Sequence, residues 1–116
     1  MTLNELQQKL QNNPETIEFA DTMAVIEQLY DFTPAAFTNG DVRNDAGQNS
    51  GSCKLFAFAR LQGLNEQQTL DCFGSFYRND VLGNPDGEDH QNIRNFINTG
   101  WSGVEFATQP LTPKAR

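Results

Sequence analysis

Hydrophobic residues recur at helical spacing in five stretches of the chain, and polar stretches separate them. Leucines at i, i+3 and i+7 predict an amphipathic helix over 3–12 with Thr2 as its N-cap, and an apolar stripe at i, i+4, i+7 and i+11 predicts a second helix over 14–30. Residues 53–62 are apolar on almost every side, so we expect a central, buried helix there. Shorter stripes predict two further helices, over 66–77 and 90–99.

The segments between these helices carry signals for turns and short strands. Asn39-Gly40 is a dipeptide preferred in tight hairpin turns, and it allows a small β-hairpin at this point. Apolar and polar residues alternate near the end of 101–106, which indicates a short C-terminal strand. Two prolines lie beyond that segment, and we expect a flexible tail over 107–116.

The fold class that follows is mainly α. We expect a single-domain compact bundle of about five helices over 1–106, with long polar loops and room for a small hairpin or one short strand. A chain of 116 residues is the length of one ordinary domain. The loops at 44–52 and 81–88 are the segments in which we expect function, because irregular polar loops on a rigid scaffold often carry recognition.

Composition and charge exclude several classes of protein. Fifteen acidic residues against eight basic ones give a net charge of -7, which argues against binding nucleic acid or an anionic membrane surface. Hydrophobic residues make up only 37% of the chain, but nine phenylalanines indicate a domain that folds. We find no membrane-spanning stretch and no signal-peptide pattern, and two cysteines are too few for a disulfide scaffold. We therefore expect a cytoplasmic protein.

One constellation of residues would suit thiol chemistry. Cys53 begins the central helix, where the helix dipole lowers a thiol pKa and favours the thiolate. His90 is the single histidine and therefore the one imidazole base, which Asn49 or Asp89 could support. These residues allow a small thiol-dependent hydrolase or transferase as the alternative function. The other interpretation is that Cys53 is a small buried hydrophobic residue and that His90 bonds locally.

Metal and cofactor signatures are incomplete in this sequence. The acidic residues of 41–49 and 80–89 do not follow the spacing of a calcium-binding EF-hand loop, and one histidine with two distant cysteines is no zinc signature. The glycines at 47 and 51 are one residue too close for a phosphate-binding P-loop and lack its Gly-Lys pair. We expect no dedicated metal and no cofactor.

The first hypothesis is a non-enzymatic module that binds a protein or a small molecule. Its working surface would combine the loop at 39–53 with the loop at 78–92, and Arg78 or Arg94 would pair with Asp80 or Asp89 to hold the second loop. An acidic surface favours a basic partner. The candidate binding residues are Asn39, Asn44, Asn49, Ser52, Lys54, Arg78, Asp80, Asp89, His90 and Arg94.

Several consecutive blocks of the sequence resemble the HopJ family of type III effector proteins. The blocks are Asn39-Gly40, Ala46–Ala59, Thr69–Gly74, Tyr77–Leu82, Pro85–Arg94 and Gly100–Gly103. The resemblance extends from about Leu10 to Phe106. It implies a Gram-negative bacterial origin, delivery into host cells through type III secretion, a role in virulence and a host partner. It brings no catalytic residues or ligand, and a protein that stays in the bacterial cytoplasm remains an equal alternative.

Overall fold

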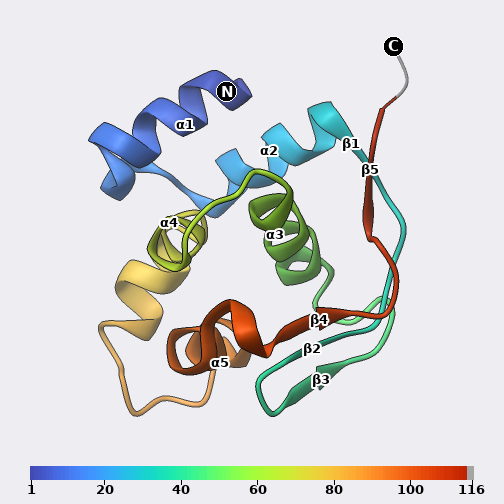
Figure 1. Ribbon diagram of the computed structural model, residues 1–116. Coiled ribbons are helices and arrows are strands. Elements are labelled where there is room, and N and C mark those ends of the chain that lie inside the picture. Colours follow the sequence, from blue (N-terminus) through green and yellow to red (C-terminus); the bar gives the residue numbers. More distant parts are fainter. Residues whose placement is uncertain (115–116) are drawn as a thin grey trace.

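Helix α3 (Ser50–Leu61) lies at the centre of the molecule, and the other helices and the strands surround it (Figure 1). The computed structural model describes residues 1–114. The prediction of a central, buried helix is confirmed. Because the Cys53 amide donates to the carbonyl of Asn49, the helix begins at Ser50, earlier than the apolar pattern indicates. Its buried residues are Cys53, Leu55, Phe56, Ala57, Phe58 and Ala59.

The first two predicted helices differ in outcome. Helix α1 (Leu3–Asn12) matches its prediction, including the N-cap at Thr2. The single helix expected over 14–30 is wrong, because the segment divides into a short 3₁₀ turn, η1 (Pro14–Thr16), and helix α2 (Phe19–Leu29). Ile17 separates them in an extended conformation with its side chain fully buried in the core. The free energy gained by burying the Ile17 side chain outweighs the free energy of continuing the helix through it.

The fourth predicted helix is also interrupted. Helix α4 (Glu66–Asp71) ends where Gly74 adopts a φ of +65°, and a π-helical segment, η2 (Phe76–Val81), follows it. A Cβ on Gly74 would lie 2.7 Å from the backbone of Glu18, so the close approach of these two segments requires glycine. Helix α5 (Gln91–Thr99) then leads into a 3₁₀ turn, η3 (Gly100–Gly103).

A three-stranded antiparallel sheet packs beside α5. Its order is β3 (Val42–Asn44), β2 (Phe37–Asn39) and β4 (Val104–Phe106). The first two strands form a hairpin across the Asn39-Gly40 turn, and the third is the short strand expected near the C-terminus. The hairpin and the short strand have only weak signals in the sequence, but together they form the sheet beside α5.

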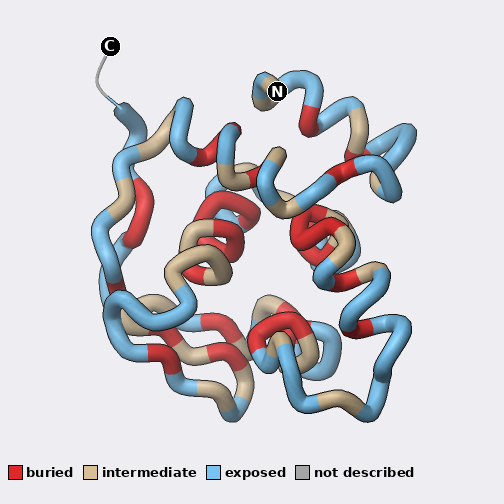
Figure 2. Tube along the Cα trace, turned by 180° about the vertical axis from the view of Figure 1, so that it is seen from behind, coloured by how far each residue is buried: buried red, intermediate tan, exposed pale blue. Residues whose placement is uncertain are grey.

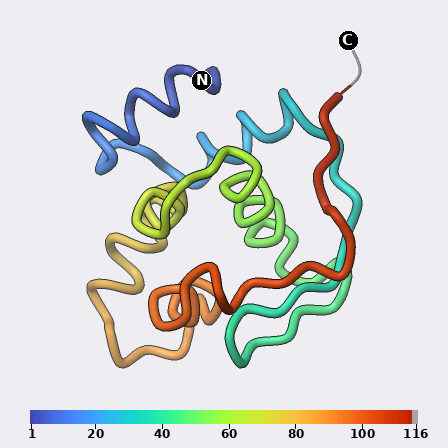
Figure 3. The backbone as a smooth tube through the Cα atoms, viewed as in Figure 1, coloured from blue at the N-terminus to red at the C-terminus, as the bar shows by residue number. Residues whose placement is uncertain are grey.

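A second sheet joins distant parts of the chain. Strand β1 (Tyr30–Phe32) follows α2 directly and pairs antiparallel with β5 (Leu111–Pro113), as Figure 3 shows where the C-terminal trace runs beside residues 30–32. The Leu111 side chain is fully buried. Instead of the expected flexible tail from residue 107, the folded domain therefore continues through β5, and residues 115–116 lie outside the described part of the chain.

The fold class expected from the sequence is wrong. Over the described residues the protein is 54% helical with 13% strand, so it is a mixed α/β domain and no mainly α bundle. The buried residues gather on the inward sides of α3, α5 and the sheets (Figure 2). None of the helices in residues 1–114 has the length and apolar content that a membrane crossing requires.

Candidate functional site

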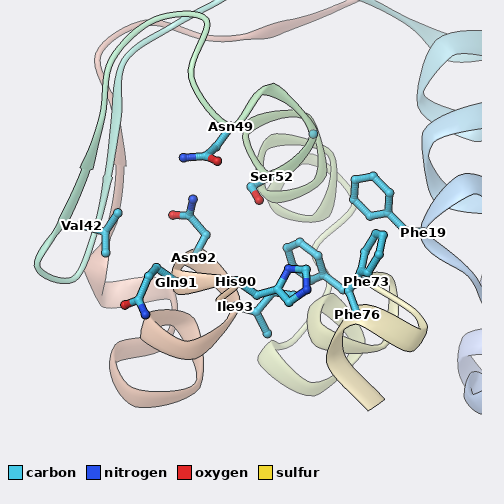
Figure 4. A pocket seen from close by; sticks show the side chains of 11 residues that line it. Phe19, Val42, Asn49, Ser52, Phe73, Phe76, His90, Gln91, Asn92 and Ile93 are labelled. Carbon is cyan, nitrogen blue, oxygen red and sulfur yellow. The ribbon is translucent and has the colours of Figure 1, made fainter. Parts of the chain in front are cut away.

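A cavity of about 480 Å³ opens where the first turns of α3 and α5 meet (Figure 4). The first polar loop reaches this cavity through Asn49 and Ser52, whereas the second contributes only its end, from His90 to Asn92, and no residue of 81–88 lines the cavity. One wall is apolar and the other is polar, and no Asp, Glu, Lys or Arg of the described chain lines the cavity. The apolar wall consists of Phe19, Phe73, Phe76 and Ile93, and the His90 ring lies beside Phe76 (Figure 4). The polar wall consists of Asn49, Gly51, Ser52, Gln91 and Asn92, with Val42 beside them.

Aromatic rings in succession form much of the apolar wall. The rings of Phe73 and Phe19 stack with centroids 6.1 Å apart, and Phe19 lies 5.4 Å from Phe76. The Phe76 ring lies in turn 5.2 Å from the imidazole of His90. Phe76 stays 39% exposed, although an aromatic side chain gains by burial. Gly51 leaves room for this row, since a Cβ there would lie 2.7 Å from the Phe19 ring.

Two unusual backbone conformations lie at this cavity. Asn49 (φ +49°) precedes α3 and His90 (φ +51°) precedes α5, and within residues 1–114 they are the non-glycine residues with positive φ. Neither side chain caps its helix, so the first-turn N–H groups of both helices lack a side-chain acceptor. A left-handed conformation at a non-glycine residue costs about 1–3 kcal/mol, and such residues cluster at functional sites.

Behind the polar wall lies a set of hydrogen-bonded asparagines, Asn39, Asn44, Asn49 and Asn92, which we term the carboxamide cluster. The Asn39 Nδ2 donates to the backbone carbonyl of Asn92 (2.7 Å), which fixes the orientation of the Asn39 amide. The Nδ2 groups of Asn39 and Asn44 both donate to Asn92 Oδ1 (3.2 Å each). Asn92 and Asn49 donate in return to Asn44 Oδ1, at 3.1 and 2.6 Å.

Three members of the cluster are buried, Asn49 is exposed, and the hydrogen bonds are almost fully satisfied. Asn39 and Asn44 are fully buried, and Asn92 is 6% exposed. Within the described chain, the Oδ1 of Asn39 is the buried side-chain polar atom without a partner. Only Asn49 and Asn92 reach the cavity, so the cluster holds two of the polar lining residues in place. The predicted residues Asn39 and Asn44 therefore support the cavity from behind and do not line it.

His90 is bonded to a neighbouring carboxylate. Its Nε2 lies 3.0 Å from Asp80 Oδ2 and 3.7 Å from Asp89 Oδ2. Hydrogen bonding from Arg94 holds the pKa of Asp89 below its ordinary value. The ligand atoms of Asp80, Asp89 and His90 lie within 4.8 Å of one another, so these residues are the described group that could hold a divalent cation. Both carboxylates are exposed, and they already engage Arg94 and His90.

Cys53 does not have the environment of a nucleophile. It is 1% exposed, it does not line the cavity, and its Sγ donates to the carbonyl of Ala35 at 3.8 Å. Burial raises the pKa of the Cys53 thiol, so the lowering expected from the helix dipole is wrong. Burial also raises the pKa of Cys72, to about 12. No hydrogen bond joins Cys53 to His90 in the described structure.

The basic candidates lie away from the cavity lining. The Lys54 ammonium lies over the Phe32 ring, 4.9 Å from its centroid. Arg78 pairs with Glu18 at 2.7 Å, where we had expected Asp80 or Asp89.

Arg94 does pair with Asp89, at 2.5 Å, as the sequence analysis allowed. It also donates to the carbonyls of Asn84 and Pro85. Arg94 thereby holds the loop before α5.

Sequence reasoning missed much of the cavity lining. The phenylalanines at 19, 73 and 76 have the helical spacing of core residues, and no local signal distinguishes a ring that lines a cavity from one that fills the core. Gln91 and Asn92 follow His90 directly, and the density of amides around the only histidine is the signal that could have selected them.

The comparisons with known proteins settle the relationship. The family model of the HopJ type III effector protein matches residues 3–111. The chain belongs to the HopJ family. The crystal structure of the unknown function protein VPA0580 is similar, with a TM-score of 0.95 and 59% sequence identity over 98% of this chain and 95% of that one. A search of the curated proteins gives no significant match. The resemblance seen in the sequence blocks is thus confirmed.

Proposed function

We propose that this HopJ protein is a non-enzymatic binding module whose cavity between the first turns of α3 and α5 receives a small molecule. The volume lies within the range of about 300–1,000 Å³ that is usual for ligand pockets. Its lining combines apolar rings with a few oriented polar groups, which is also the usual composition of such pockets.

The observation that carries the proposal is the backbone conformation of Asn49 and His90. Both residues have a positive φ, both begin a helix without capping it, and both line the same cavity. The π-helical segment η2 contributes Phe76 to the same lining, and π-helical turns are also frequent at functional sites. Features that cost stability and converge on one cavity are best explained by selection for binding.

The thiol-dependent hydrolase or transferase has less support. A nucleophile must reach its base and its substrate, whereas the Cys53 thiol faces a backbone carbonyl in the core and its pKa is raised. We expect Cys53 and Cys72 to react with a thiol reagent at pH 8 only at the rate at which unfolding exposes them. A cysteine that labels rapidly in the folded protein would restore the enzyme hypothesis.

The binding proposal is tested with a chemically diverse fragment set, followed by the backbone amide shifts of the protein in NMR. We expect hits that perturb Asn49, Ser52 and Gln91 first. The variant Ser52→Phe, which fills the cavity, should abolish these perturbations. The matched control Ser102→Phe alters an exposed serine of η3 outside the cavity and should retain them. If all hits perturb residues outside the cavity, the proposed site is wrong. It is also wrong if a protein that binds the wild type binds Ser52→Phe with the same affinity.

We further propose that the protein is delivered into host cells by type III secretion and acts on a host target there. The family description supports this, because it identifies type III effectors. A fusion to a translocation reporter should enter host cells from a bacterium with an intact type III system. It should not enter from an otherwise identical secretion-deficient strain. Equal signals from both strains would contradict delivery by this route and favour a protein that stays in the bacterium.

A further inference from the structure

We propose that the cavity takes an uncharged, planar heteroaromatic ring whose edge carries both a hydrogen-bond donor and an acceptor, the chemistry of a purine base. This inference rests on the proposed binding function of the cavity and narrows its ligand to one chemical class. It depends on three features of the lining: the row of rings, the orientation of the free amide oxygens and the absence of Asp, Glu, Lys and Arg among the described lining residues.

The row of rings selects a flat ligand. Phe19, Phe76 and His90 follow one another at centroid distances of 5.4 and 5.2 Å along the wall. The Phe76 and His90 planes are inclined by only 31°, and the two rings lie side by side in the lining (Figure 4). Aromatic faces bind a planar ring by stacking, and the exposed surface of Phe76 is available for this contact. A saturated ring has no face of this kind.

The polar wall supplies acceptors in fixed positions. In residues 1–114 no hydrogen bond occupies Asn49 Oδ1, Gln91 Oε1 or the Ser52 hydroxyl. The amide of Asn49 cannot turn round, because its Nδ2 donates to Asn44 Oδ1 at 2.6 Å within the carboxamide cluster. The Nε2 of Gln91 donates to the Glu88 carbonyl at 2.6 Å, which fixes that amide too. Figure 4 shows the Asn49 oxygen on the side of Ser52.

Donors complement these acceptors on the same wall. The Ser52 hydroxyl can donate as well as accept, and the first-turn N–H groups of α3 and α5 have no side-chain acceptor. A ligand must therefore offer both hydrogen-bond donors and acceptors along one edge to satisfy the wall. Purine bases have this edge, since ring nitrogens accept and an exocyclic amino group donates.

The lining disfavours charged ligands. A carboxylate would place its lone pairs against those of Asn49 and Gln91, and the benzoate probe below tests whether the first-turn N–H groups and His90 outweigh this. An ammonium ligand would find no Asp or Glu among the described lining residues. An uncharged ring loses less solvation on entering such a wall than an ion does.

The test compares three probes of similar size by amide shifts in NMR: adenine, benzoate and cyclohexanecarboxamide. Adenine has the flat, uncharged ring with a mixed edge, benzoate is flat but anionic, and cyclohexanecarboxamide is uncharged but saturated. We expect adenine to perturb Asn49, Ser52 and Gln91 and to bind at least about tenfold more tightly than either other probe, because benzoate lacks the uncharged mixed edge and cyclohexanecarboxamide lacks the aromatic face.

Two variants identify the contacts. Gln91→Leu keeps the size of the side chain but removes its fixed acceptor, and it should weaken adenine binding about tenfold. Asn98→Leu is the matched control, because Asn98 lies on the same helix outside the cavity lining and should leave binding unchanged. Phe76→Leu keeps an apolar side chain without the aromatic face and should also weaken adenine about tenfold.

The outcomes separate this inference from the proposed function. If benzoate or cyclohexanecarboxamide perturbs the cavity residues as strongly as adenine does, the ligand class is wrong while binding at the cavity stands. If adenine fails to perturb the cavity, the inference is overturned, whatever the fragment set shows. If adenine and every fragment perturb only other surfaces, both proposals fall. Binding of adenine that survives both Gln91→Leu and Phe76→Leu also overturns the inference.

Discussion

The apolar core around Phe56 and three of the four asparagines of the carboxamide cluster are buried, but the two regions are held together by different forces. Phe56 packs against the rings of Phe37, Phe73, Phe96 and Trp101, with centroids 5.0–6.3 Å apart. This packing is largely non-directional and depends on the volume that is filled. The cluster depends on hydrogen bonds, whose strength depends on direction.

The contrast explains why the two regions serve different purposes. A core held by volume tolerates similar apolar side chains, whereas a satisfied polar network admits one arrangement and loses much when one member is removed. The core therefore stabilises the fold, and the cluster specifies the position of Asn49 and Asn92 at the cavity. Substitutions in each region, and one at the surface, test this difference.

The largest effect is expected from Phe56→Ala. Removing a fully buried ring leaves a void in the core, and we expect a loss of about 3–5 kcal/mol in the free energy of unfolding. Urea denaturation measures it. Phe56→Leu keeps most of the apolar volume and should lose much less. Equal losses for the two variants would show that the ring's shape, and not the filled volume, governs this region.

A smaller but sharper effect is expected from Asn44→Leu. Leucine has a similar size, so the expected loss of about 2–3 kcal/mol comes mainly from the buried amide of Asn92, which loses its partner, and from the broken bond to the exposed Asn49. Asn98→Leu replaces an exposed asparagine and should change stability by less than about 0.5 kcal/mol. If Asn44→Leu is as stable as the wild type, the cluster is not a network that acts as a unit.

An isolated polar group within the apolar core provides the next comparison. The Thr22 hydroxyl is fully buried and donates to the Cys72 carbonyl at 2.9 Å. Thr22→Val has nearly the same shape and breaks this single bond, so we expect a loss of about 1 kcal/mol by urea denaturation. A loss as large as that of Asn44→Leu would mean that membership of a network adds nothing to a buried hydrogen bond.

The smallest effect is expected at the surface, for Asp89→Asn. Because Arg94 lowers the pKa of Asp89, the folded protein gains stability above the ordinary Asp pKa of about 4 and loses it as the pH falls through the lowered value. The variant should therefore melt slightly below the wild type at pH 7, and the difference should vanish near pH 2 in thermal scans. A difference that grows in acid would contradict this sign.

How far the sequence predicts the fold depends on how local each signal is. The apolar pattern of α3 and the cap of α1 act within a few residues, and both were predicted. Interruptions at Ile17 and Gly74 arise from contacts with segments far along the chain, so the helical period continues through them in the sequence. Strand β5 was missed because its proline reads as a breaker, although an edge strand of a small sheet accommodates it.

The features of the candidate site also differ in how local their sequence signals are. The sequence indicates that both polar loops lie near the start of the central helix. This placement accounts for the meeting of Asn49, Ser52 and His90 at one cavity. The burial of the Cys53 thiol depends on the packing of Ala35 against it, and the pattern around residue 35 does not reveal this. Composition alone cannot show that four asparagines meet, because their contacts connect three separate elements and a helix start.

The pairing of β1 with β5 joins segments that leave the ribosome far apart in time. While a nascent chain still lacks Leu111, the edge of β1 has no partner and the core next to it stays open. An unpaired strand edge is a site for association with other chains. The domain therefore completes its fold only after β5 has been synthesised, and a chain stalled before Leu111 would expose the unpaired edge of β1.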